Sequence, residues 1–270
     1  MESKYKNVSD IMIVESDELY HSKSKDFLSS HALGDYIDSP ILYHQKKLGI
    51  IPAFDSAAFS LGRAFHTMAL EGKEVFDERY AVGGPINPAT EKPYGVQTNK
   101  FKQWAKEQAK PVVSFDDLTK IKGMYDGFLR SAEAALLISD GKAEGVIRAQ
   151  MGGFNCQIRV DWLNIHHGIV DLKTTRCLDT FIQDAKEFSY LRQLAFYQEV
   201  IFQSTGMILP VYMVAVEKKA PFRCGVWQIG QNELNTCIAE LKEQMARLRK
   251  SISTNNWPTG YEEIRTFQSI

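Results

Sequence analysis

The sequence predicts an α/β protein, because segments that alternate like strands are interleaved with segments that have the spacing of amphipathic helices. Residues 156–165 and 168–174 alternate on either side of a polar turn at His166, which is the pattern of a β-hairpin. Residues 231–252 carry an apolar stripe at helical spacing. The 270 residues are enough for one large domain, or two small ones, with a substantial core.

The remaining elements follow in order from the same two periodicities and from turn residues. A first strand is expected near residues 11–14, and Ser39-Pro40 is a boundary within a helical segment over 20–47. The other helices are expected over 55–70, 101–110, 118–138 and 178–204, and the other strands over 143–149, 210–216 and 223–229. We expect the helix 231–252 to pack on the sheet through Leu234, Ile238, Leu241, Met245, Leu248 and Ile252.

The charge balance and the cysteines exclude several classes of protein. A formal net charge of −1 excludes a general polycation that coats nucleic acid, so any DNA contact must come from a local basic groove or a metal site. The cysteines form no CxxC pair, which argues against a zinc ribbon or a disulfide framework and favours reduced core thiols in a cytosolic protein: Cys156, Cys177, Cys224 and Cys237. The start of the chain lacks the apolar region of a signal peptide, and no apolar run is long enough to cross a membrane.

The hairpin carries the chemistry of greatest interest. Asp171 and Lys173 are two apart on a strand and share a face, and a turn centred on His166 places Asp161 directly across from Asp171. Two adjacent carboxylates repel each other unless a cation lies between them, and Mg²⁺ takes such oxygen ligands. A metal and a lysine together indicate phosphodiester hydrolysis. A lone Asp-x-Lys on a strand is more often a solvated face, but the second acid favours a site.

Other candidate residues carry weaker signals. His66 lies beside the apolar stripe of the helix 55–70, where a histidine is more often a hydrogen-bonded core residue than a ligand. The turn-rich, lysine-containing segment over 83–99 is too polar for the core. Its Lys92, with Lys100 just beyond it, suits contacts with a phosphate backbone or a solvated flap equally well.

Four motifs in this order resemble the PD-(D/E)XK nuclease superfamily, and more narrowly the RecE-type exonucleases, the group of exonuclease VIII and its phage relatives. They are G-R-A-F-H at 62–66, R-V-D at 159–161, G-I-V-D-L-K-T-T at 168–175 and Y-L-R-Q-L-A-F-Y at 190–197. The resemblance covers most of the chain. It implies one nuclease domain over residues 1–270, with an N-terminal arm and helices over 1–50, the core over 51–252 and a tail over 253–270, built on a mixed central sheet flanked by helices.

The resemblance also implies roles for individual residues. The metal ligands would be His66, Asp161, Asp171 and the backbone carbonyl of Leu172, with Glu144 as a further candidate, and the ion would be Mg²⁺ or alternatively Mn²⁺. The catalytic set would be Asp161, Asp171, Lys173, Gln193 and Tyr197, with Lys173 positioning the attacking water. Contacts to DNA would come from Arg63, Lys92, Lys100 and Thr174.

The activity implied by this family is digestion of linear double-stranded DNA from the 5′ end, which releases 5′-mononucleotides and leaves a 3′ single-stranded tail. The resemblance further implies a homo-oligomeric ring of three or four subunits around the duplex. It implies a RecT-like single-strand annealing protein as a partner in recombination, and the cytoplasm of a bacterial host, as for phage or prophage proteins, as the location.

Three other functions remain compatible with the residues. A DNA endonuclease on the same core would cut closed circles, which an exonuclease cannot. A non-catalytic DNA-binding protein is opposed by the intact set of Asp161, Asp171 and Lys173. A metal-dependent hydrolase of another substrate explains the hairpin but not the other motifs. An iron–sulfur nuclease is disfavoured because the cysteines are widely spaced.

Overall fold

The structure, a computed structural model, describes residues 10–52 and 57–266. The main helices are α1 Asp17–Ser22, α2 Ser30–Asp38, α3 Pro40–Lys47, α4 Ala57–His66, α5 Lys73–Arg79, α6 Asn99–Glu107, α7 Phe115–Leu129, α8 Ala132–Leu137, α9 Phe181–Glu187, α10 Tyr190–Thr205 and α11 Gln231–Thr254. Shorter turns of helix lie at Lys23–Lys25, Thr67–Glu71 and Leu178–Thr180. The strands are β1 Ala81–Val82, β2 Val112–Val113, β3 Lys142–Met151, β4 Phe154–Asn164, β5 Gly168–Thr175, β6 Val211–Glu217 and β7 Cys224–Gln228.

The centre of the fold is a mixed sheet with the strand order β3-β4-β5-β6-β7. Only β5 and β6 are parallel in this sheet, and its other neighbours are antiparallel. A two-residue turn joins β3 to β4, and Gly152 and Gly153 both adopt the positive φ angles that such a tight turn requires. The predicted α/β class with a mixed, helix-flanked sheet is therefore confirmed.

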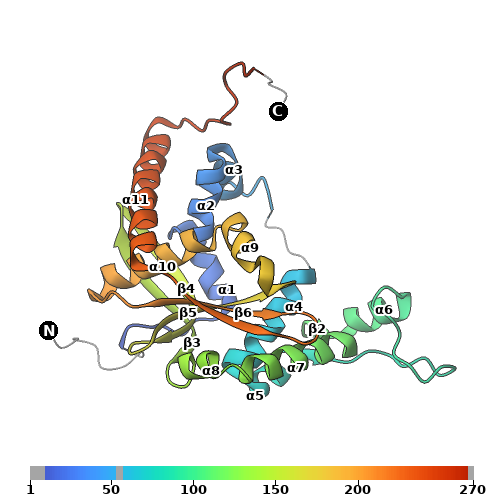
Figure 1. Ribbon diagram of the computed structural model, residues 1–270. Helices are drawn as coiled ribbons and strands as arrows, with labels where there is room; N and C mark the ends of the chain where they lie inside the picture. Colours follow the sequence, from blue (N-terminus) through green and yellow to red (C-terminus); the bar gives the residue numbers. More distant parts are fainter. Residues whose placement is uncertain (1–9, 53–56, 267–270) are drawn as a thin grey trace.

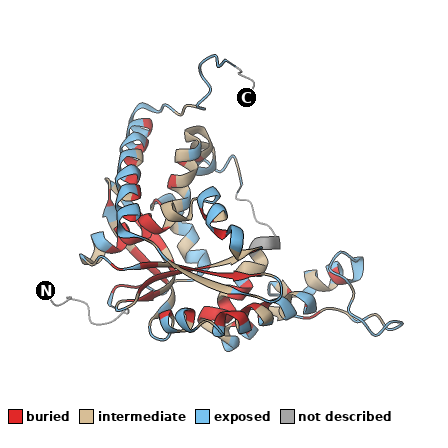
Figure 2. Ribbon diagram, in the orientation of Figure 1, coloured by how far each residue is buried: buried red, intermediate tan, exposed pale blue. Residues whose placement is uncertain are grey.

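Helices cover both faces of the sheet and enclose two apolar clusters (Figure 1). One cluster joins the sheet to α2, α9, α10 and α11, and the other joins it to α4, α5, α7 and α8. Figure 2 shows the buried residues concentrated along the strands and α10. Successive residues of β5 point to opposite faces of the sheet, so Ile169 packs in the first cluster and Val170 in the second.

The predicted helix over 178–204 is interrupted, and this break matters for the site. The chain forms a short turn of helix and then α9, and α10 starts anew at Tyr190. Ser189 between the two helices has φ 55°, in the left-handed region that an α-helix excludes. The predicted helix over 118–138 is also divided, because Ser131 starts α8 by accepting a hydrogen bond from the Ala134 amide.

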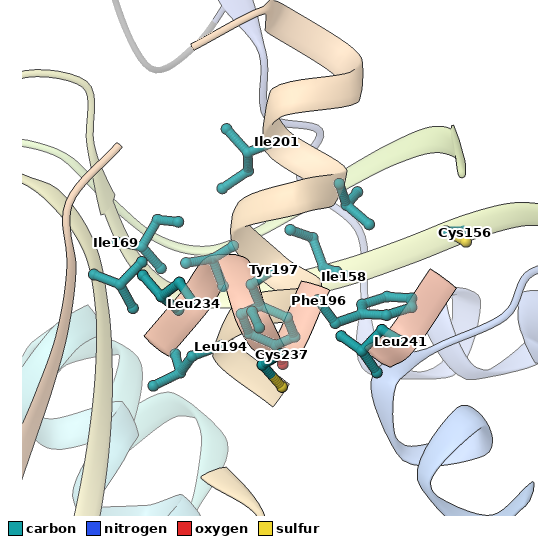
Figure 3. Close-up of a cluster of buried hydrophobic side chains, with 14 of the residues drawn as sticks. Cys156, Ile158, Ile169, Leu194, Phe196, Tyr197, Ile201, Leu234, Cys237 and Leu241 are labelled. Atoms are coloured by element: carbon teal, nitrogen blue, oxygen red, sulfur yellow. The ribbon is translucent and has the colours of Figure 1, made fainter. Parts of the chain in front are cut away.

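The expectation that helix 231–252 packs on the sheet is wrong in its main contact. Helix α11 packs chiefly against α10 and α2, because α10 already occupies that face of the sheet. Figure 3 shows Phe196 of α10 in the same cluster as Ile158 of the sheet and Leu241 of α11. The predicted stripe also ends differently, since Ile252 is 49% exposed.

The helical segment predicted over 20–47 is divided into the end of α1, a short turn of helix, α2 and α3, and α5, β1 and β2 lie outside the predicted elements. The strand expected at 11–14 is a single bridge between Ile13 and Val146. Ser39 caps α3 and Pro40 is its first residue, so the predicted boundary is confirmed. All four cysteines are free, but only Cys156 and Cys237 are buried in the core. Among the described residues, no helix is both long and apolar enough to cross a bilayer.

Candidate active site

The hairpin of β4 and β5 has the predicted register. Its ladder pairs enclose a loop centred on His166 and end one step before the two acids: Asn164–Gly168, Leu163–Ile169 and Trp162–Val170. Asp161 and Asp171 come next in this register, where the two strands separate. Here the Leu172 amide donates a hydrogen bond of 2.8 Å to the side-chain Oδ2 of Asp161 on β4. The end of the ladder thus holds the Asp161 carboxylate in place.

Three side chains converge beside this point and could hold a metal ion. His66, Glu144 and Asp161 each offer one ligand atom, and these atoms lie within 4.8 Å of one another. His66 is the last residue of α4, and its Nδ1 lies 3.6 Å from Asp161 Oδ2. The residues on either side of Glu144 in β3 pair with the residues on either side of Asp161 in β4. Glu144 and Asp161 therefore face each other across the ladder. This cluster includes Glu144 and does not include Asp171.

Asp171 contacts the lysine of the motif instead. It is 1% exposed, and Lys173 Nζ lies 2.7 Å from its Oδ2. Both carboxylate oxygens of Asp171 are buried, and among the described residues Oδ1 has no hydrogen-bond partner and Oδ2 has only this ammonium beside it. A buried carboxylate oxygen without a partner is costly, and it usually indicates a missing ion or a functional role.

The surroundings of the three site acids raise their pKa values. Burial and the neighbouring Asp161 carboxylate raise the pKa of Glu144 to about 8. Burial also raises the pKa values of Asp161 and Asp171, although the Lys173 ammonium opposes it in both. A divalent cation would relieve this repulsion, because it favours the ionised form of each acid.

The basic groups of the site respond to the same surroundings. Burial and the charge of Lys173 lower the pKa of His66 to about 4, so its imidazole is neutral and able to act as a ligand. Burial lowers the pKa of Lys173, but the Asp171 and Asp161 carboxylates outweigh it and the pKa is raised. The lysine therefore acts as a fixed positive charge.

A chain of polar contacts connects Lys173 to α10. Lys173 Nζ lies 3.4 Å from Gln193 Oε1, and Gln193 Nε2 donates to the Tyr197 hydroxyl at 2.9 Å. Gln193 and Tyr197 are one helical turn apart, and the break at Ser189 starts α10 where this face is directed at β5. The structure therefore brings together Lys173, Gln193 and Tyr197, as the sequence predicts.

The predicted DNA-contact residues fall into two places. Arg63 is exposed on α4, which runs beside β5, and a Cβ on Gly62 would lie 3.7 Å from Thr174 Oγ1. Lys92 and Lys100 are exposed on the loop that follows β1 and on α6, which project from the body of the molecule (Figure 1). The structure does not bring these two lysines to the acid cluster.

Two site residues are absent from the sequence-based prediction. Arg159 Nε lies 3.1 Å from Glu144 Oε2, and it shares a strand face with Asp161 two residues later. Lys173 Nζ lies 4.7 Å from the ring centroid of Tyr190, within range of a cation–π interaction. The two-residue spacing in R-V-D was a signal for Arg159, and Tyr190 is the first residue of the motif Y-L-R-Q-L-A-F-Y.

The donor set fits a hard divalent cation. Carboxylates from two strands supply oxygen ligands, a neutral imidazole adds nitrogen, and the buried carboxylate of Asp171 lies on the adjacent strand. The pKa of Glu144, which burial and the Asp161 carboxylate raise, points the same way, since a cation between the two acids removes the repulsion. The geometry and the electrostatics therefore agree.

Comparisons with known proteins identify the family. A family model described as a PDDEXK-like domain of unknown function matches residues 21–269. A crystal structure from Eubacterium rectale, of a protein described as a candidate exonuclease, is similar in fold with a TM-score of 0.66 and 16% identity, over 95% of this chain and 97% of that chain. No curated protein matches the sequence. Because the family model matches nearly the whole chain, this protein belongs to the PDDEXK-like family and hence to the PD-(D/E)XK nuclease superfamily.

Proposed function

We propose that this chain is a metal-dependent exonuclease that digests linear double-stranded DNA from the 5′ end, releasing 5′-mononucleotides and leaving a 3′ single-stranded tail. The observation that carries the proposal is the buried Asp171 carboxylate, whose Oδ1 has no hydrogen-bond partner among the described residues and whose Oδ2 lies against Lys173, beside the cluster of His66, Glu144 and Asp161. The family supports a nuclease, and the exonuclease description of the Eubacterium rectale protein favours digestion from ends. The polarity follows from the resemblance to RecE-type enzymes.

Each side chain has a defined task in this proposal. A divalent ion held by His66, Glu144, Asp161 and Asp171 would supply a Lewis acid and an activated water. Lys173 carries a fixed positive charge that orients a water and stabilises the negative charge developing on the phosphate.

The neighbouring residues fix the geometry of these groups. Gln193 accepts from Lys173 and donates to Tyr197, which limits the positions available to the ammonium. The Leu172 amide holds the Asp161 carboxylate. Small displacements of reacting groups cost large factors in rate, so these contacts serve catalysis directly.

The partners form part of the same proposal. With a formal net charge of −1, a subunit has no general affinity for DNA, and a ring of three or four subunits would retain the duplex by enclosing it. The 3′ tail is the substrate of a RecT-like annealing protein, and both would act in the cytoplasm of a bacterial host. A monomeric mass at working concentration would contradict the ring.

The test is a digestion time course on linear duplex DNA labelled at one 5′ end, beside closed circular plasmid. We expect early release of labelled mononucleotide from the linear DNA alone, with Mg²⁺ or Mn²⁺, and none with EDTA or for Lys173→Ala. The control is Lys186→Ala, since Lys186 is exposed on α9. Cleavage of the circle would establish an endonuclease instead, and binding without cleavage would establish a non-catalytic protein.

A further inference from the structure

An exposed aromatic side chain lies one ring away from the catalytic lysine. Phe188, which directly follows α9, is 60% exposed. Its ring centroid lies 5.9 Å from that of Tyr190, with 30° between the planes. Tyr190 in turn lies over the ammonium of Lys173, at 4.7 Å. The active site therefore continues into an aromatic surface that no step of the hydrolysis uses.

This surface is rigidly supported. Tyr190 also packs against Phe181, which is 1% exposed, at a centroid distance of 6.2 Å. The backbone between the rings of Phe188 and Tyr190 is held at Ser189, whose hydroxyl accepts a 2.6 Å hydrogen bond from Arg192. Arg192 is anchored in turn to Asp38 of α2 at 3.2 Å. Phe188 is therefore presented to solvent by a fixed turn.

A positive charge and an aromatic face side by side match the two parts of a nucleotide. The ammonium of Lys173 suits a phosphate, and the ring of Phe188 suits the flat face of a base. Stacking on an aromatic ring requires the base to be free of its complement, because a paired base is covered by its neighbours in the duplex. We infer that Phe188 and Tyr190 form a stacking platform for an unpaired nucleobase of the strand under attack.

This inference rests on the proposed nuclease function and specifies its substrate. The strand would enter the site as a frayed end, already separated from its complement, and the platform would stabilise the separated base. Phe188 would therefore affect substrate binding more than the chemical step. Base stacking on an aromatic side chain contributes enough affinity that its loss weakens binding about tenfold.

The test measures DNA binding in EDTA, so that it does not depend on cleavage. The two probes are duplexes with two unpaired nucleotides at one 5′ end, which carry either natural bases or abasic sites. The variants are Phe188→Ala, Phe188→Tyr and, as a matched control, Phe202→Ala, since Phe202 is an exposed phenylalanine on the distal part of α10. We expect wild type, Phe188→Tyr and Phe202→Ala to bind the natural probe about tenfold more tightly than the abasic probe. For Phe188→Ala we expect nearly equal binding.

Two results would overturn the platform. One is a wild-type protein that binds both probes equally, and the other is a Phe188→Ala variant that keeps the full preference. If linear DNA is still digested in either case, the nuclease proposal stands and only the platform falls. If the wild type neither binds nor digests any DNA, both proposals fail together.

Discussion

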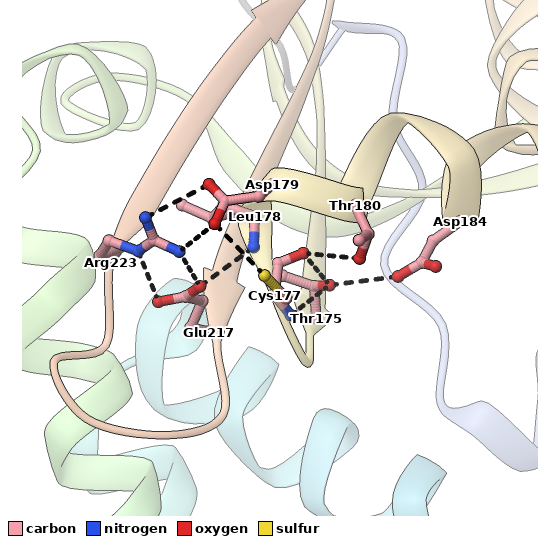
Figure 4. A network of polar contacts seen from close by, with 8 residues as sticks. All are labelled: Thr175, Cys177, Leu178, Asp179, Thr180, Asp184, Glu217 and Arg223. Atoms are coloured by element: carbon pink, nitrogen blue, oxygen red, sulfur yellow. Dashed lines mark hydrogen bonds and ion pairs between the residues drawn. The ribbon is translucent and has the colours of Figure 1, made fainter.

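Two buried acids on adjacent strands of the sheet have opposite surroundings. Asp171 in the middle of β5 is 1% exposed, and among the described residues its Oδ1 has no hydrogen-bond partner and its Oδ2 has only the Lys173 ammonium beside it. Glu217, at the end of β6, is 5% exposed and pairs with Thr175 of β5 in the ladder. Its carboxylate accepts from the Leu178 amide at 3.0 Å and from two nitrogens of Arg223, at 2.7 and 2.9 Å. Figure 4 shows this network, in which Asp179 binds the same arginine.

The pKa values of these two carboxyl groups are therefore shifted in opposite directions, although the groups lie only four residues apart along adjacent strands. The Arg223 guanidinium and the Leu178 amide lower the pKa of Glu217 to about 2, although burial opposes them. Burial raises the pKa of Asp171, and Lys173 only partly offsets it. Fully satisfied acids stabilise the fold, whereas unsatisfied acids with raised pKa values mark a functional site. Substitutions at the two places test this contrast.

The largest expected effect is on catalysis. Lys173→Ala should lower the single-turnover cleavage rate about 10²- to 10⁴-fold, because a positioned proton-transfer or charge-stabilising group contributes this much. Glu217→Gln, in the satisfied network, should leave the rate of the folded protein within a few fold. A cleavage rate of Lys173→Ala within twofold of the wild type would refute the assignment of Lys173.

Metal binding should separate the two places next. Adding Mn²⁺ at one hundred times its dissociation constant should stabilise the wild type by about 2.7 kcal/mol, measured by urea unfolding. Asp161→Asn should lose this gain, because Asp161 belongs to the cluster with His66 and Glu144. Asp179→Asn, at an exposed acid of the other network, is the control and should keep the gain. Equal gains in both variants would show that the metal binds elsewhere.

A smaller effect is expected on stability. Glu217→Ala should lower the free energy of unfolding by about 2 kcal/mol, because the partly buried Leu178 amide loses its acceptor. Nuclease activity per folded molecule should be retained. The measurement is urea unfolding at pH 7 together with the cleavage assay. Unchanged stability would mean that this network contributes nothing to the fold.

The smallest effect is a pH dependence. The pKa of Glu217 falls from an ordinary value of 4.5 to about 2 on folding, so its stabilisation is present above pH 4.5 and is lost as the pH falls towards 2. The difference in unfolding free energy between the wild type and Glu217→Gln should therefore shrink between pH 5 and pH 2. The unfolding free energy of Glu243→Gln, at an exposed acid on α11, should differ from that of the wild type by less than about 1 kcal/mol over the whole pH range. A difference that grows in acid would reverse the sign of the argument.

Local patterns in the sequence were sufficient for much of this protein. The alternation of β4 and β5 and the polar turn at His166 predict both strands and their register, because side chains on a strand repeat every two residues. The four-residue spacing of Gln193 and Tyr197 predicts a shared helix face for the same kind of reason. These features depend only on residues that are close together in the chain.

Other features depend on contacts between distant segments, and only the tertiary structure decided them. Glu144 lies beside His66 and Asp161 because β3 pairs with β4, whereas the sequence alone offered Glu144 only as a further candidate ligand. The helix breaks at Ser189 although its pattern is continuous, and the break places Tyr190 over Lys173.

The course of α11 is the clearest case of the same dependence. Its apolar stripe predicts a buried face but does not indicate which neighbour covers that face. In the structure, α10 lies against the sheet and α11 packs on α10. Periodicity along the chain indicated most strands of the central sheet and the register of the hairpin, but not the helix breaks at Ser131 and Ser189. The partners of each face, and the unsatisfied acids of the site, were decided by packing, because burial and pairing depend on residues far apart in the sequence.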